Sequence, residues 1–183
     1  MNSTLDLKVK TSIPKSIPKI EKSLASLATN KPTLLHTLKI EKATIIDIET
    51  VNFVGGILEV GAIVIDNKLE IISEIEVRTN VKVPDKHICG VIPCGKFSEG
   101  EAVKILNNSV EGMIIGWNLE FERRVLVRYG YTISGFDLMK WIKQVYTIQD
   151  YKLDTVCKFF SVEKVGHRAL SDCLAVLDIL RKI

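Results

Sequence analysis

The sequence of 183 residues lacks the features of a membrane protein, a secreted protein or a zinc protein. No hydrophobic run approaches the roughly 18 residues of a membrane span, and the N-terminus has no apolar segment of a secretory signal. The four cysteines fit a reduced compartment. Cys89 and Cys94 lie near His87, but no second pair of zinc ligands follows at regular spacing. We therefore expect an intracellular protein, in the cytoplasm or nucleus, that is not bound to a membrane.

The N-terminal part of the chain differs in composition from the rest. Residues 1–42 are rich in lysine, serine, threonine and proline, contain no arginine, and repeat Ile-Pro-Lys at Ile13–Lys15 and Ile17–Lys19. Proline interrupts the hydrogen bonding of helices and strands. We predict a flexible basic extension with a short helix near residues 20–28, followed by one domain over residues 43–183. A docking peptide, a nucleic-acid-holding arm and a targeting segment stay open as roles for the extension. The net charge of +3 permits an anionic partner without requiring one.

Hydrophobic periodicity predicts strands first, and then helices alternating with strands. Ser98 and Glu101 form a capping box, and Asn118 is a favourable N-cap residue. We expect strands at residues 42–51, 57–65, 69–77, 111–117 and 131–134. We expect helices at residues 98–107, 118–130, 139–145 and 153–160, and a last helix that contains the hydrophobic stripe Leu170 to Leu180. This order indicates an α/β fold with a mixed sheet and helices on its faces.

Two carboxylates interrupt the first predicted strand. Asp47 and Glu49 are two residues apart in an otherwise hydrophobic segment, so they point to the same face of the strand. Like charges side by side repel each other and lose hydration. A bound divalent cation would offset both costs, and magnesium and manganese prefer carboxylate oxygens.

Three motifs in order resemble those of the DEDDh 3′→5′ exonucleases, the superfamily of the DnaQ-like proofreading exonuclease, ribonuclease T and oligoribonuclease. Asp47–Thr50 resembles the first motif, and Asn118–Glu122 resembles the second, at the start of a helix. His167–Asp172 is similar to the third, a His-Arg-Ala-Leu stretch with an aspartate five residues after the histidine. Tyr151–Asp154 resembles the Tyr-x-Leu-Asp that leads into it. All three together are far more specific than any one alone.

The resemblance implies a fold, an activity and partners. The fold would be ribonuclease H-like, with a five-stranded mixed sheet of three antiparallel and two further strands, flanked by helices. The activity would be metal-dependent 3′→5′ hydrolysis of single-stranded DNA or RNA to nucleoside 5′-monophosphates, in proofreading, repair or RNA processing. Partners would be nucleic-acid 3′ ends and a polymerase or another replication or repair protein. Several relatives are dimers, so a homodimer is a further expectation.

The resemblance also assigns roles to individual residues. Two Mg²⁺ or Mn²⁺ ions would be bridged by Asp47, while Glu49 and Asp172 bind the ion that holds the water and Glu122 supports the other. His167 would be the general base. On one continuous helix, His167 and Asp172 would point about 140° apart, so we predict that His167 lies in a loop before the helix. The residues expected to bind substrate are Thr50, Asn118 and Phe53, whose ring could stack on a base or pack in the core.

Two departures from the motifs leave a second reading open. The second motif has Glu122 in place of the usual aspartate, and Thr50 is not followed by the frequent glycine. A glutamate is one methylene longer, which shifts ion placement. The alternative is therefore a catalytically weakened nucleic-acid-binding or polymerase-docking module on the same fold. A ribonuclease H-like nuclease that cuts internally fits the fold but not the spacing of His167 and Asp172.

Overall fold

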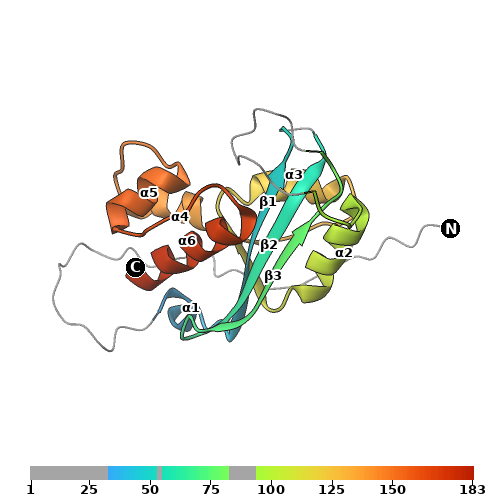
Figure 1. Cartoon of the computed structure of the whole chain (residues 1–183). Coiled ribbons are helices and arrows are strands. Elements are labelled where there is room, and N and C mark those ends of the chain that lie inside the picture. The colour runs from blue at the N-terminus through green and yellow to red at the C-terminus, as the bar shows by residue number, and fades with distance from the viewer. Residues whose placement is uncertain (1–32, 53–54, 83–93) are drawn as a thin grey trace.

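A computed structural model describes residues 33–52, 55–82 and 94–183, and a five-stranded sheet lies at its centre (Figure 1). The strand order is β3-β2-β1-β4-β5. β1 pairs antiparallel with β2, as β2 does with β3, whereas β4 is parallel to β1 and to β5. The strands are β1 (Lys42–Thr50), β2 (Ile57–Asp66), β3 (Ile71–Arg78), β4 (Met113–Gly116) and β5 (Gly135–Asp137). The predicted mixed sheet of three antiparallel and two further strands is confirmed.

Helices cover both faces of this sheet. The described helices are α1 (Leu34–Thr37), α2 (Glu99–Ser109), α3 (Glu120–Val127), α4 (Leu138–Val145), α5 (Leu153–Phe160) and α6 (Ala169–Lys182). Side chains of α1, α4, α5 and α6 form one hydrophobic cluster with the sheet, and side chains of α2 and α3 form the other. Figure 1 shows α6 and α2 on opposite sides of the strands. In the described residues no helix has the length and hydrophobicity needed to cross a membrane.

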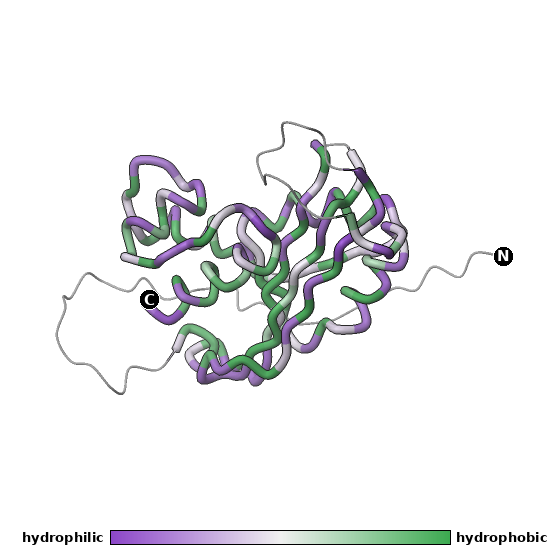
Figure 2. Tube along the Cα trace, viewed as in Figure 1, coloured by the Kyte–Doolittle hydropathy of each residue, from purple (hydrophilic) through white to green (hydrophobic). Residues whose placement is uncertain are grey.

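The two central strands are hydrophobic on both faces because both faces are covered. Ile45 of β1 and Ile63 of β2 are opposite each other and pack toward α6, whereas Ile46 and Ile48 pack toward α2 and α3. Figure 2 shows this concentration of hydrophobic residues along the strands. Since side chains alternate along a strand, Asp47 shares the α6 face with Ile45.

Two local predictions were wrong in detail. The last strand begins at Gly135 rather than at residue 131. A Cβ atom at Gly135 would lie 2.2 Å from the carbonyl oxygen of Ile114, so close pairing with β4 starts where a glycine allows it. Asn118 does not cap α3, because its φ of 63° places it in a left-handed turn and Leu119 is the N-cap residue. By contrast, the capping box of Ser98 and Glu101 is confirmed at the start of α2.

The end of the predicted extension packs against the domain. Thr33 caps α1, and its hydroxyl donates a hydrogen bond to the carbonyl oxygen of Asn67 at 2.6 Å. Leu34 and Leu35 are buried in the same cluster as α6. Residues 33–42 therefore contribute to the folded body. The predicted helix near residues 20–28 and Phe53 lie outside the described residues.

Candidate active site

The first and third motifs meet at the carboxyl end of β1. Asp47 and Glu49 leave β1 on the face that α6 covers, and Asp172 lies in the first turn of α6. One carboxylate oxygen from each of the three residues lies within 4.8 Å of the others. The sequence therefore predicted correctly that these three carboxylates converge.

A glycine on the neighbouring strand permits this approach. Gly61 of β2 is the register partner of Asp47. A Cβ atom on Gly61 would lie 2.5 Å from the backbone of Ala169 and Leu170, closer than a side chain tolerates. The backbone of α6 thus rests directly on the sheet at this point, and Asp172 is brought to β1.

The second motif adds a buried carboxylate. Glu122, in the first turn of α3, is 2% exposed. Among the described residues its Oε2 atom has no hydrogen-bond partner. Burial raises the pKa of Glu122 to about 8, and the charges of Asp137 and Glu49 add to the rise. An unpaired buried carboxylate is costly unless a cation or a proton compensates it.

The pKa values of Asp47 and Asp172 are raised for the same reasons. Burial, followed by the charges of Glu122 and Glu49, raises the pKa of Asp47 well above its usual range. Burial raises the pKa of Asp172 to about 6, although the ammonium of Lys164 opposes this rise. Clustered acids with raised pKa values are typical of functional sites.

His167 lies in the segment between α5 and α6, ahead of the first helical residue Ala169. The prediction that it precedes the helix is confirmed. Its side chain is 45% exposed, and Nε2 lies 3.5 Å from Oδ2 of Asp154. On the other side of the ring, Nδ1 lies 3.1 Å from Nζ of Lys164. Both ring nitrogens therefore face charged partners.

A buried ion pair fixes the start of α6. Glu59 is fully buried, and its carboxylate accepts hydrogen bonds from Nε of Arg168 at 2.7 Å and from the backbone nitrogen of Ala169 at 3.3 Å. Arg168 also reaches Glu76 at 2.9 Å. Although burial raises the pKa of Glu59, the hydrogen bonds from Arg168 outweigh it and hold the pKa below its ordinary value. This pair sets the position of the residues on either side of Arg168.

Sequence reasoning did not identify Glu59 or Lys164 as part of the site. Glu59 is more than a hundred residues from Arg168 in the chain, so no local spacing connects them. Glu59 does show one signal, a charged residue inside a strand that is otherwise hydrophobic. Lys164 shows no such signal, because in the sequence nothing distinguishes it from other lysines in loops.

A groove of about 670 Å³ opens over the carboxylates and contains residues of all three motifs. One wall is the segment between α4 and α5, where the indole nitrogen of Trp117 donates to the carbonyl oxygen of Tyr151 at 3.2 Å. Lys143 and Lys152 line the groove, as does Asn118. The groove is therefore acidic at its floor and partly basic at its wall.

Thr50, at the end of β1, is the residue expected to bind the terminal nucleotide, and it is buried. Its hydroxyl donates a hydrogen bond to the carbonyl oxygen of Asn52 at 2.8 Å. The turn that follows is held from α3, because a guanidinium nitrogen of Arg128 donates to the carbonyl oxygen of Gly55 at 3.1 Å. Arg123 likewise donates to the backbone at Ile133. These contacts indicate that Arg123 and Arg128 hold the neighbouring loops in place.

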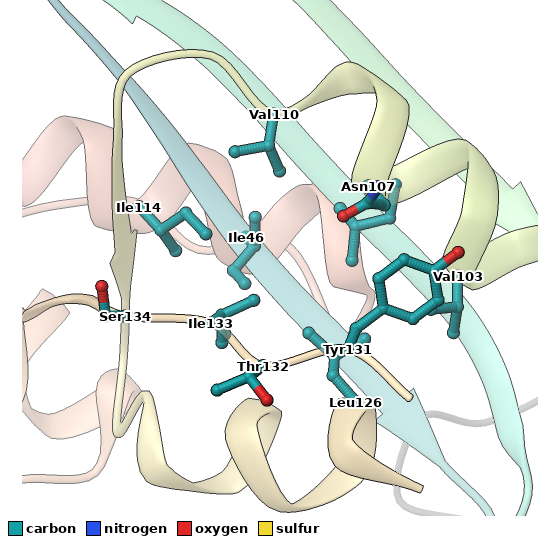
Figure 3. A pocket seen from close by; sticks show the side chains of 11 residues that line it. Ile46, Val103, Asn107, Val110, Ile114, Leu126, Tyr131, Thr132, Ile133 and Ser134 are labelled. Carbon is teal, nitrogen blue, oxygen red and sulfur yellow. The ribbon is translucent and has the colours of Figure 1, made fainter. Parts of the chain in front are cut away.

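A second pocket lies on the other face of the sheet, among α2, α3, β4 and residues 131–134 (Figure 3). Its lining is mostly hydrophobic and includes Ile46, Ile114 and Ile133, and it contains no acidic or basic side chain. The cavity volume is about 20 Å³, close to the ~10–15 Å³ that one water molecule needs. This pocket has neither the groups nor the room for phosphodiester chemistry.

The carboxylate cluster fits divalent cations. Magnesium and manganese take hard oxygen ligands, and Asp47, Glu49, Asp172 and Glu122 supply carboxylate oxygens only. The buried Oε2 of Glu122, which has no partner in the described part of the chain, is the atom that a cation would satisfy. We conclude that the residues present suit a metal site.

The strand order β3-β2-β1-β4-β5, with helices on both faces, is that of the ribonuclease H-like fold, and the acidic floor lies at the end of β1. Solved structures of exonuclease I are among those that share this fold. Neither a protein-family model nor a curated protein matches the sequence.

Three of these structures illustrate the likeness. A product-bound exonuclease I has a TM-score of 0.63 and 15% identity, and the match covers 78% of this chain and 43% of that one. A zinc-bound complex of E. coli exonuclease I with single-stranded DNA has a TM-score of 0.61 and 16% identity, over 75% of this chain and 39% of that one. An exonuclease I from Methylocaldum szegediense has a TM-score of 0.58 and 17% identity, over 77% and 40%. The chain thus spans about two fifths of the length of these proteins.

Proposed function

We propose that this protein is a metal-dependent 3′→5′ exonuclease that hydrolyses single-stranded DNA or RNA and releases nucleoside 5′-monophosphates. The observation that supports this most directly is the convergence of Asp47, Glu49 and Asp172 within 4.8 Å, beside the buried carboxylate of Glu122. The shared fold with exonuclease I, solved with single-stranded DNA and with product, adds support.

In this proposal the carboxylates hold two divalent ions, Mg²⁺ or Mn²⁺. Asp47 would be shared between the ions, Glu49 and Asp172 would bind one, and Glu122 would support the other. When bound, such ions activate an attacking water and stabilise the departing 3′ oxygen. The raised pKa values of Asp47, Glu122 and Asp172 support the assignment, because a bound cation offsets both the burial and the repulsion that raise them.

His167 would act as the general base and accept the proton of the attacking water. An imidazole is suited to proton transfer near neutral pH, and His167 lines the groove at its exposed side. The carboxylate of Asp154, 3.5 Å from Nε2, would stabilise the imidazolium that results. Base catalysis then requires that Nδ1, which faces Lys164, becomes available.

The groove would receive the 3′ end of a single strand. Its floor holds the acids, and Lys143 and Lys152 on the wall would contact phosphates. Asn118, which lines the groove, would contact the terminal nucleotide. A contact from Thr50, which is buried, stays a prediction of the sequence. The choice between DNA and RNA, the binding of a polymerase or repair protein, the formation of a homodimer and an intracellular location stay predictions of the sequence.

A second candidate is a nucleic-acid-binding module with weakened catalysis. Two observations favour it: the carboxyl group of Glu122, with its pKa raised to about 8, is protonated at neutral pH without a cation, and both ring nitrogens of His167 face partners. Under this candidate, Glu122→Asp would not increase turnover, and oligonucleotides would bind without being shortened.

The test is digestion of 5′-labelled single-stranded DNA and RNA of matched sequence with magnesium, manganese or a chelator. The expected result is a metal-dependent ladder that shortens from the 3′ end, and Asp47→Ala abolishes it while the variant still melts cooperatively. If a folded wild-type protein binds both strands and shortens neither, the binding module is the correct function. Internal cleavage would instead give products of unrelated lengths.

A further inference from the structure

Lys164 lies beside the carboxylate cluster and is almost completely buried, with 6% of its side chain exposed. Four acceptor atoms surround its ammonium. The carbonyl oxygen of Gly166 is 2.6 Å from Nζ, Oδ1 of Asp154 and Oδ1 of Asp172 are each 3.0 Å away, and Nδ1 of His167 is 3.1 Å away. A lysine ammonium has three donors and no acceptor. The ammonium is therefore held within the site by two hydrogen-bond partners and two ion pairs.

The charge of this lysine balances the acids around it. It opposes the rise of the pKa of both Asp47 and Asp172. Hydrogen bonds from Lys164 to Asp154 and Asp172 also keep its own pKa above the ordinary value in spite of burial. A fixed positive charge thus stands 3.0 Å from an oxygen of Asp172, one of the three carboxylates that converge.

We propose that Lys164 competes with a divalent cation for Asp172 and thereby lowers the metal affinity of the site; this inference rests on the metal-dependent function proposed above. The ammonium of Lys164 already lies 3.0 Å from Oδ1 of Asp172, and it would repel a divalent cation that binds the same carboxylate in this partly buried setting. Metal binding then requires the flexible lysine side chain to leave Asp172. The lysine therefore raises the concentration of metal that is needed to load the site.

The same movement affects His167. Because an ammonium only donates, Nδ1 of His167 is the acceptor in this contact, and the proton of the neutral ring lies on Nε2, facing Asp154. A displacement that takes Nζ away from both Asp172 and His167 removes the donor from Nδ1 and makes its lone pair available. Metal loading and the availability of the general base are therefore coupled.

A purely structural role for Lys164 makes a different prediction. If the lysine only ties the segment between α5 and α6 to α6, its removal lowers stability equally with and without metal and leaves metal affinity unchanged. Competition predicts that its removal destabilises the metal-free protein, because the carboxylates lose their counter-charge, and that metal restores the loss. The two roles thus differ in whether removal of Lys164 raises the metal affinity or leaves it unchanged.

The experiment is a Mn²⁺ titration of the full chain by calorimetry at one pH, with thermal melting in chelator and in Mn²⁺. The variants are Lys164→Met, which keeps the length, and Lys164→Gln, which keeps a donor without the charge. Lys104→Met, at an exposed position on α2, is the matched control. We expect both Lys164 variants to bind Mn²⁺ about tenfold tighter, a typical size for coupled binding events, and to gain more melting temperature from Mn²⁺ than the wild type does.

The outcomes separate this inference from the function on which it rests. Equal or weaker Mn²⁺ binding by both Lys164 variants, with binding by the wild type intact, overturns the competition and leaves the exonuclease proposal standing. No Mn²⁺ binding by the wild type or by either variant overturns both. If Lys164→Met does not fold in chelator, Lys164→Gln and the Mn²⁺ titration of the wild type decide the question in the same way.

Discussion

The two faces of β1 are built from alternate residues of one strand, yet they have opposite properties. Ile46 and Ile48 face α2 and α3 within a hydrophobic cluster, whereas Asp47 and Glu49 face α6 and meet Asp172. The first face gains stability from burial. The second face loses stability through burial, as the raised pKa of Asp47 indicates. A charged cluster that lowers stability is expected where the binding of a ligand offsets that loss.

The largest expected contrast is between Asp47→Ala and Ile48→Ala. The first removes the central carboxylate, and we expect a loss of about 10³-fold in exonuclease activity, which corresponds to about 4 kcal/mol of transition-state stabilisation. Without metal its stability should be unchanged or higher, because a repelled buried carboxyl group is gone. Ile48 is 2% exposed, and its truncation should lower the free energy of unfolding by about 2–5 kcal/mol.

Urea unfolding and single-turnover digestion of both variants measure this contrast. Ile48 also lines the groove, so the activity of Ile48→Ala should fall by at most a few fold at temperatures where it is folded, far less than that of Asp47→Ala. The distinction between the faces fails if Asp47→Ala loses stability as Ile48→Ala does, or if folded Ile48→Ala loses as much activity as Asp47→Ala.

The next contrast lies within the α6 face, between a buried and a partly exposed partner of Arg168. Glu59→Ala removes the fully buried carboxylate, and we expect a loss of about 3–5 kcal/mol in unfolding free energy. The start of α6 also loses an anchor, so activity per folded molecule should fall. Glu76→Ala removes the other carboxylate, which is 32% exposed in its side chain, and should cost about 1 kcal/mol or less. Chemical unfolding of the two variants side by side checks this, and equal losses would contradict it.

The sequence predicted the carboxylates of the candidate site better than it predicted the contacts that hold them in place. Asp47, Glu49 and Asp172 could be predicted because strand alternation and the three motifs are local patterns. His167 could be placed before the helix by the geometry of a helical turn. The anchor between Glu59 and Arg168, and the contact between Lys164 and Asp172, depend on tertiary packing that no local spacing encodes.

Backbone detail escaped prediction for a related reason. The pattern of residues 131–134 resembles a strand, but Tyr131 and Ile133 pack against the hydrophobic cluster of α2 and α3. Pairing with β4 begins only at Gly135. Asn118 has the side chain of a good cap, yet the tight turn between β4 and α3 needs a residue with positive φ there. Asparagine tolerates that conformation better than most residues do, so Asn118 forms the turn instead of capping the helix.

The pH dependence of stability should reveal the cost of burying the carboxylates of the site. In chelator, Glu122 has a folded-state pKa of about 8 against an ordinary value of 4.5. A carboxyl group with a raised folded-state pKa contributes stability that is fully present below the unfolded-state value and is lost as the pH rises through the folded-state value. We expect unfolding free energy to fall by a few kcal/mol between pH ~4.5 and ~8 at roughly 1.4 kcal/mol per pKa unit.

Urea unfolding of Glu122→Gln in chelator should show a much flatter profile over this range. Glu120→Gln, an exposed change on the same helix, is the control and should keep the slope of the wild type. Mn²⁺ should also flatten the wild-type profile, because a cation at the site holds Glu122 ionised in the folded state. A wild-type profile in chelator that rises with pH would contradict the assignment.

The smallest expected effect tests the basic wall against the acidic floor. Lys152 is exposed on the groove wall, outside the carboxylate cluster. If it contacts one phosphate, Lys152→Ala should weaken binding of a single-stranded oligonucleotide by a few fold, equally for DNA and RNA, and lower the slope of log affinity against log salt by about 1. Fluorescence anisotropy at several salt concentrations measures both, and Lys182→Ala at the exposed end of α6 is the control for net charge. An unchanged salt slope in Lys152→Ala would place the strand on another path, and the floor and wall would then not serve one substrate.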